Sequence, residues 1–146
     1  MSYKKLFITL SISAVLMYLM MFLNMNSIND YYTSLTRIYM ALMMVSPMAI
    51  LMIIMMGKMY PNKKYNSIII VVSALIFVLT LTGLRMQIPI NDEQYLKAMI
   101  PHHSSAIMTS RNADIKDPEV RKLADSIIKS QQREIDEMNR MIKRLR

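Results

Sequence analysis

Residues 66–96 read NSIIIVVSALIFVLTLTGLRMQIPINDEQYL, and this stretch divides the chain into two parts. Its first segment, Asn66 to Leu84, carries no charged residue and is long enough to cross the ~30 Å core of a bilayer as a helix. A few residues later come Asn91 and Asp92, which are typical of a helix N-terminus. The stretch therefore predicts a membrane helix followed closely by a water-soluble helix.

Two further uncharged runs lie upstream, LFITLSISAVLMYLMMFL from residue 6 and IYMALMMVSPMAILMIIMM from residue 38. Together the three runs predict transmembrane helices over about residues 6–24, 38–57 and 66–84. The first run is longer than the apolar region of a secretory signal, and no small-residue cleavage site follows it, so we expect it to be retained. We predict an all-α chain with a membrane part at 1–85, a linker at 86–91 and a soluble part at 92–146.

The formal net charge of +8 is concentrated in the membrane part. Residues 1–85 carry seven Lys and Arg against one Asp, whereas residues 86–146 carry 11 basic and nine acidic side chains. Lysines precede the first apolar run and separate the second from the third, so the positive-inside rule places the N-terminus and the second loop in the cytoplasm. We therefore expect an integral protein of a cytoplasmic (inner) membrane with an extracytoplasmic C-terminal part, and no nucleic-acid partner.

The soluble part is predicted to form a helical hairpin. Its first helix runs from Asp92 to about Arg111, and its second begins at Asp117-Pro118-Glu119, a capping carboxylate, a proline at the first helical position and an acid in the first turn. Apolar residues then recur at helical spacing, at Val120, Leu123, Ala124, Ile127, Ile128, Ile135, Met138, Ile142 and Leu145. Because two helices bury little core, we expect a homodimeric four-helix bundle, or packing against the membrane helices.

The only two histidines stand in AMIPHHSSAIM, residues 98–108, in a chain with 18 Met and no Cys. At 100° per residue, Tyr95, Leu96, Met99, His103, Ala106, Ile107 and Ser110 share one face of the first helix. His102 lies at the edge of this face, and Met108 points away if the helix is regular. On the second helix Gln131 lies within the apolar stripe, with Glu134 near its edge and Met138 one turn further. A closed hairpin allows these groups to converge.

Two interpretations of this cluster stay open. Thioether ligands favour Cu(I) or Ag(I) and imidazole also binds copper, whereas zinc sites generally use Cys or several His. A histidine on an apolar helix face is, however, usually a hydrogen-bonded core residue, and Met is a flexible filler of cores. The same choice applies to the second membrane helix, whose eight methionines between Met40 and Met59 provide either a thioether track for Cu(I) or ordinary apolar packing.

MIPHHSSAIM, at residues 99–108, and DPEVRKLADSIIKSQQREIDEM, at residues 117–138, resemble the ferritin-like family known as domain of unknown function 305. The likeness covers about residues 92–146. The family pattern falls on Met99, His102, His103, Met108, Gln131, Glu134, Ile135 and Met138. The resemblance implies a helical bundle that binds copper or silver. Its metal ligands would be Met99, His102, His103, Met108 and Met138, with Gln131 and Glu134 orienting them.

We therefore expect a membrane-anchored extracytoplasmic protein that sequesters or transfers Cu(I) or Ag(I), or confers tolerance to it. The alternative is a membrane-tethered, dimerising interaction module in which the histidines are structural. An enzyme is not expected, because the chain has no Cys nucleophile, no phosphate-binding glycine loop and no Glu-x-x-His spacing of a di-metal oxidase.

Overall fold

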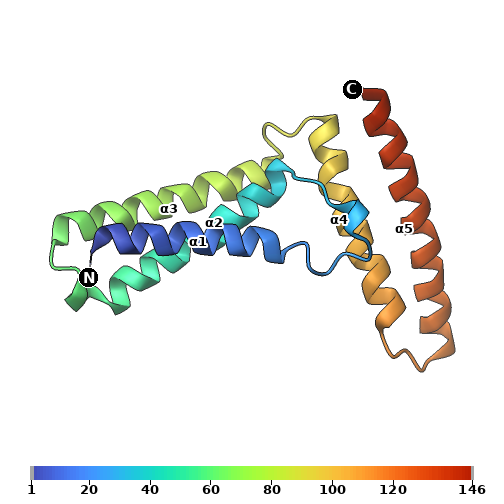
Figure 1. Ribbon diagram of the computed structural model, residues 1–146, viewed down its shortest axis with the longest axis horizontal. Helices are drawn as coiled ribbons and strands as arrows, with labels where there is room; N and C mark the ends of the chain where they lie inside the picture. The colour runs from blue at the N-terminus through green and yellow to red at the C-terminus, as the bar shows by residue number, and fades with distance from the viewer. Residues whose placement is uncertain (1, 146) are drawn as a thin grey trace. The chain divides into compact units, whose positions relative to one another are not determined.

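A computed structural model describes residues 2–145, and all regular structure in that range is helical. Two compact units are present. The first unit joins the N-terminal helix to Thr36–Pro89, and the second joins Met21–Leu35 to the chain from Ile90 onward. The helices, labelled in Figure 1, are α1 (Tyr3–Met20), η1 (Ile28–Asp30), α2 (Leu35–Met55), η2 (Gly57–Met59), α3 (Lys63–Met86), α4 (Asp92–Asn112) and α5 (Pro118–Leu145). The predicted all-α class is confirmed.

In the first unit, α1, α2 and α3 are each long and apolar enough to cross a membrane. Few of their side chains are buried within the chain, with 6%, 22% and 11% of the most apolar window of each helix covered. An apolar surface of this extent is suited to lipid and not to water. Three candidate spans are thus present, as the uncharged runs predict.

The bounds of these helices differ from the predicted spans. α1 ends at Met20 instead of about residue 24, because the chain from Met21 onward folds with the second unit. α3 begins at Lys63, since the side chain of Asn62 accepts a hydrogen bond from the backbone N–H of Tyr65. It continues to Met86, after which Gln87 adopts the left-handed conformation (φ 53°) that commonly ends a helix.

In the second unit, α4 and α5 form the predicted helical hairpin (Figure 1). The side chain of Asn91 caps α4 by accepting a hydrogen bond from the N–H of Gln94 at 2.9 Å. The Asp117 carboxylate accepts hydrogen bonds from the N–H groups of Glu119 and Val120 at 2.9 and 3.0 Å, which satisfies donors that have no partner within the helix. The expected N-terminal signals of both helices are therefore present.

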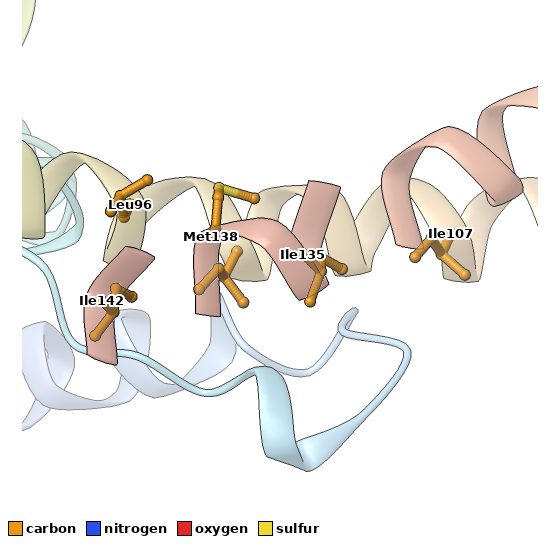
Figure 2. Packing of buried hydrophobic residues seen from close by; sticks show 6 residues of the cluster. Leu96, Ile107, Ile135, Met138 and Ile142 are labelled. Carbon is orange, nitrogen blue, oxygen red and sulfur yellow. The ribbon is translucent and has the colours of Figure 1, made fainter. Parts of the chain in front are cut away.

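A single hydrophobic cluster holds the hairpin together (Figure 2). Its buried members are Leu96, Ile100, Ile107, Ile135, Met138 and Ile142, with Tyr32, Met99, Ile128 and Met141 packed around them. Burying one such side chain contributes about 1.5–3 kcal/mol to folding. The cluster lies midway along α4 and in the C-terminal half of α5.

Several residues of the predicted apolar faces are not buried within the single chain. Tyr95 is 52% exposed on α4, and Val120, Leu123 and Leu145 are 51%, 60% and 46% exposed on α5. One neighbouring helix covers only a narrow stripe of another, so an apolar face wider than that stripe stays partly in solvent.

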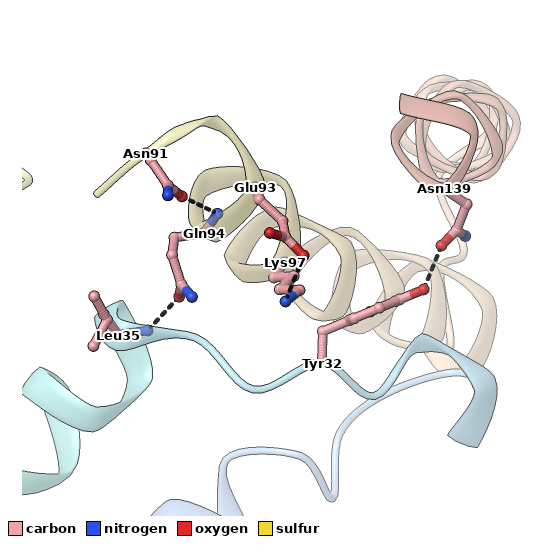
Figure 3. A network of polar contacts seen from close by, with 7 residues as sticks. All are labelled: Tyr32, Leu35, Asn91, Glu93, Gln94, Lys97 and Asn139. Carbon is pink, nitrogen blue, oxygen red and sulfur yellow. Dashed lines mark hydrogen bonds and ion pairs between the residues drawn. The ribbon is translucent and has the colours of Figure 1, made fainter. Parts of the chain in front are cut away.

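The loop between α1 and α2 belongs to the hairpin's core. We call residues 21–35 the strap. Tyr32 packs against the hydrophobic cluster and donates a hydrogen bond to the Asn139 side chain at 2.8 Å, while the N–H of Leu35 donates to the Gln94 side chain at 2.9 Å (Figure 3). The hairpin is therefore covered on one side by a segment of its own chain.

Candidate metal site

His103 lies on the side of α4 that faces α5, and both of its ring nitrogens have partners. Nδ1 lies 2.9 Å from the carbonyl oxygen of Met99, one turn earlier, and Nε2 lies 2.8 Å from Oε2 of Glu134 on α5. The His103 side chain is 16% exposed and that of Glu134 is 42% exposed. The pair thus lies at the edge of the hairpin core, where solvent still reaches the carboxylate.

The Met99 contact defines which nitrogen of His103 carries hydrogen. A carbonyl oxygen only accepts hydrogen bonds, so Nδ1 must be the donor. With a proton also on Nε2, the ring is cationic and forms an ion pair with Glu134. Without that proton, the lone pair of Nε2 points toward the Glu134 carboxylate. In many metal-binding histidines a backbone carbonyl fixes one nitrogen and the other nitrogen coordinates the ion. In His103 the second nitrogen contacts Glu134, so an ion bound at Nε2 would replace the proton of that contact.

Two of the predicted methionine ligands lie beside this pair. Met138 is 8% exposed and is a member of the hydrophobic cluster, and Met99 packs against that cluster. His102 is exposed, with its ring centroid 6.1 Å from that of His103. Met99 lies one helical turn before His103 on α4 and Met138 one turn after Glu134 on α5, so the fold brings both methionines to within about one turn of the His103–Glu134 pair.

The other two predicted residues are less closely associated. Met108 is half-buried but is not among the residues of the hydrophobic cluster, and Gln131 is half-buried on α5. No hydrogen bond between Gln131 and either histidine occurs within residues 2–145. Over the same range, no group of three His, Asp or Glu side chains is arranged to hold a metal ion. The donors at this level of the hairpin are therefore imidazole, thioether and one carboxylate.

The side of α4 toward the strap contains a polar cluster that the sequence analysis missed. The Ser104 hydroxyl is fully buried, donates to Asp30 at 2.5 Å and accepts from the N–H of Asn26 at 2.9 Å. Asn24 donates to Ser105 at 2.7 Å, and Arg111 donates to the side chain of Asn26 at 2.8 Å. The only sequence signal was the density of Asn, Ser and Asp over residues 24–30.

The fold and the His103–Glu134 pair define a class of protein. In this class three apolar helices are joined to a helical hairpin that has a His–Glu pair and methionines in its core. The chain belongs to the family described as "Domain of unknown function (DUF305)", whose pattern matches residues 79–142, from the end of α3 through most of α5. The predicted family is thereby confirmed, whereas its description as ferritin-like stays a prediction.

A relative in Acanthamoeba polyphaga mimivirus, named "Uncharacterized protein L153", is 40% identical over 119 residues. That alignment covers 80% of this chain and 76% of the relative, so the similarity extends beyond the hairpin into the first unit. No solved structure matches the chain.

Proposed function

We propose that this chain is a membrane-anchored protein that binds a soft metal ion, Cu(I) or Ag(I), as cargo on its α4–α5 hairpin. The observation that supports this most strongly is the orientation of His103, whose Nδ1 is fixed by the Met99 carbonyl while Nε2 points to Glu134. A neutral imidazole held this way offers Nε2 as a ligand, and a metal ion replaces the proton that otherwise joins Nε2 to the carboxylate.

The surrounding donors support a soft ion. Met99 and Met138 pack in the core beside His103, and His102 is exposed next to it. Thioether sulfur prefers Cu(I) and Ag(I), whereas Mg²⁺ and Ca²⁺ need several oxygen ligands. In the proposed site His103, His102, Met99 and Met138 are ligands, and Met108 completes the set through a shift of its side chain. Gln131 orients the histidines, and Glu134 orients His103 until an ion replaces the proton between them.

We propose binding and transfer of the ion as the role, not catalysis. The described part of the chain holds no carboxylate cluster of the kind that di-metal oxidases use. A single ion among thioether and imidazole ligands is suited to sequestration or to delivery to another protein.

We further propose that α1, α2 and α3 span a cytoplasmic membrane, with the N-terminus and η2 on the cytoplasmic side and the hairpin outside. The strap and the hairpin form one compact unit, which requires them to be on the same side of any membrane that the three helices cross. Lys58 within η2, and Lys63 and Lys64 at the start of α3, support a cytoplasmic location for that loop.

A titration with Cu(I) tests the metal proposal. The full chain in detergent competes with a chromophoric Cu(I) chelator, and the wild type is compared with a His102→Ala/His103→Ala double variant. The control is Thr109→Ala, which changes an exposed side chain on the same helix. We expect the wild type and the control to withdraw Cu(I) from the chelator and the double variant to fail. Equal uptake by all three proteins would rule out the assigned site.

A second candidate function is a membrane-tethered module that dimerises through the hairpin, with structural histidines. It is favoured by the exposure of Tyr95, Val120 and Leu123, an apolar surface that a second hairpin could cover to complete a four-helix bundle. It is also consistent with the His103–Glu134 ion pair, which satisfies both groups without a metal. This function predicts a mass of two chains in light scattering and no change in melting temperature with Ag(I).

A further inference from the structure

The first unit contains an apolar cavity between its three long helices, α1, α2 and α3. The cavity has a volume of about 390 Å³, near the lower limit for small-molecule sites. Apolar side chains from all three helices line it, including Leu6, Leu10, Val45, Ala49, Val72 and Ile76. No Lys, Arg, Asp, Glu or Met is part of this lining, so the cavity suits neither an ion nor the thioether track considered from the sequence.

Each helix contributes one serine to the apolar wall: Ser11 on α1, Ser46 on α2 and Ser73 on α3. Each of these serines is close to the middle of its helix. In a bilayer that level contains no water, so a hydroxyl there must find its partner within the protein or in a ligand.

The three hydroxyls differ in whether they have such a partner. Ser46 is 3% exposed and donates to the carbonyl of Leu42 at 2.7 Å, the usual arrangement for a serine inside a membrane helix. Thr80 on α3 does the same with Ile76. Ser73 is 7% exposed, yet its hydroxyl makes no hydrogen bond within residues 2–145. The Ser73 hydroxyl therefore belongs to the cavity lining and has no partner there, so a ligand in the cavity could supply one.

We propose that this cavity binds an uncharged, membrane-soluble molecule that is mostly hydrocarbon and carries a hydroxyl or carbonyl oxygen, which hydrogen-bonds to Ser73. The uncharged apolar lining selects for hydrocarbon, and the free hydroxyl selects for oxygen. Ser11, the exposed one of the three serines, also lines the cavity and provides a second hydroxyl there.

This proposal rests on the membrane-spanning role of α1–α3 and not on the metal site. Loss of Cu(I) binding by the hairpin would leave it unaffected, because every residue it uses lies in the first unit. Free fatty alcohols and sterols both combine a hydrocarbon body with a hydroxyl group. Competition between labelled and unlabelled ligands distinguishes these two sources.

Photolabelling of the full chain tests the proposal. The chain is placed in nanodiscs of phosphatidylcholine and exposed to a diazirine-bearing long-chain alcohol, or to a matched diazirine-bearing alkane without oxygen. We expect the alcohol to label peptides of α1 and α3 saturably. Unlabelled long-chain alcohol should compete if the natural ligand is a fatty alcohol, and cholesterol should compete if it is a sterol. The alkane should label without saturation.

Three variants sharpen the result. Ser73→Ala should reduce saturable labelling about fivefold or more, since an interhelical hydrogen bond in a membrane is worth about 1–2 kcal/mol in model peptides. Ala14→Leu should also abolish it by filling the cavity. Ser13→Ala, a serine on α1 outside the lining, should have no effect. Equal labelling by alcohol and alkane, insensitivity to Ser73→Ala, or cross-links showing a second copy's helix in the cavity would each overturn the proposal.

Discussion

His103 and Ser104 are adjacent on α4 and have different partners. His103 contacts Glu134 on α5, whereas Ser104 contacts Asp30 and Asn26 in the strap. One step along a helix turns the side-chain direction by about 100°, so neighbouring residues readily contact separate elements. The two sides of α4 can therefore be altered independently.

Replacing Glu134 with Gln tests the contribution of its charge to the proposed site. The amide is the same size but lacks the negative charge, which lies 2.8 Å from Nε2 and thus next to any ion bound there. A carboxylate that close to a bound cation stabilises it by about 1 kcal/mol or more. We expect Cu(I) affinity to fall about tenfold in a chelator competition. Glu137→Gln, at an exposed position on the same helix, is the matched control. A Glu134→Gln affinity equal to that of the control would contradict the assigned role.

Replacing Ser104 with Ala tests the strap. The change leaves the Asp30 carboxylate and the N–H of Asn26 without their buried partner, which costs about 1–3 kcal/mol. We expect faster amide hydrogen exchange in residues 24–30 of the full chain. Ser105→Ala removes only an exposed hydrogen bond to Asn24 and should change exchange much less. Identical exchange in the two variants would mean that the strap does not depend on Ser104.

At this scale the sequence indicated the histidine pair and a facing glutamate, because helical spacing predicts which residues share a face. It did not indicate Ser104 or Asp30. Their contact joins residues 74 positions apart, and Ser and Asp are common in loops and surfaces whether or not they are paired.

Among the elements, α5 is the one whose start depends most clearly on a single side chain. Asp117 accepts two hydrogen bonds from the first turn, and Pro118 occupies the position where a missing N–H has no cost. The signals at Asn91 and Asp117 are local in sequence, which explains why the beginnings of α4 and α5 could be predicted. The strap has no periodic pattern of apolar residues, so its structure could not be predicted from the sequence.

Asp117→Ala should destabilise the hairpin by about 0.5–2 kcal/mol, the usual effect of losing an N-terminal cap. The change in unfolding free energy is measured by urea unfolding of the full chain in detergent, with hydrogen exchange in α5 as the readout. Asp114→Ala is a suitable comparison, because Asp114 pairs only with the exposed Lys116, and an exposed pair contributes little. Equal stability of the two variants would show that the Asp117 cap is dispensable.

For the whole molecule, the proposed topology follows from the order of the three apolar helices and the strap. If all three helices cross a membrane, the strap and the hairpin share one side and the η2 turn lies on the other. The sequence predicted the number of apolar helices, because a bilayer requires long uncharged runs. It did not predict that the strap joins the hairpin, since that depends on tertiary contacts.

Cysteine labelling checks this topology directly, because the chain has no cysteine of its own. Asn29→Cys in the strap, Lys116→Cys between α4 and α5, and Lys58→Cys in η2 are treated with a membrane-impermeant maleimide on intact cells. We expect the first two to react and Lys58→Cys to react only after permeabilisation. Labelling of all three from outside, or of the Lys58 variant alone, would contradict the proposed topology.

The central claim, a soft-metal site on His103, is tested most directly by NMR of the histidine rings in the ¹⁵N-labelled full chain during titration with Ag(I). The spectrum is simple, because the chain has two histidines. We predict that the ¹⁵N chemical shift of His103 Nε2 changes on binding, while Nδ1 keeps its hydrogen bond to Met99. The signals of both ring nitrogens should stop changing once a stoichiometric amount of Ag(I) has been added. An unchanged His103 ring at saturating Ag(I) would contradict the account.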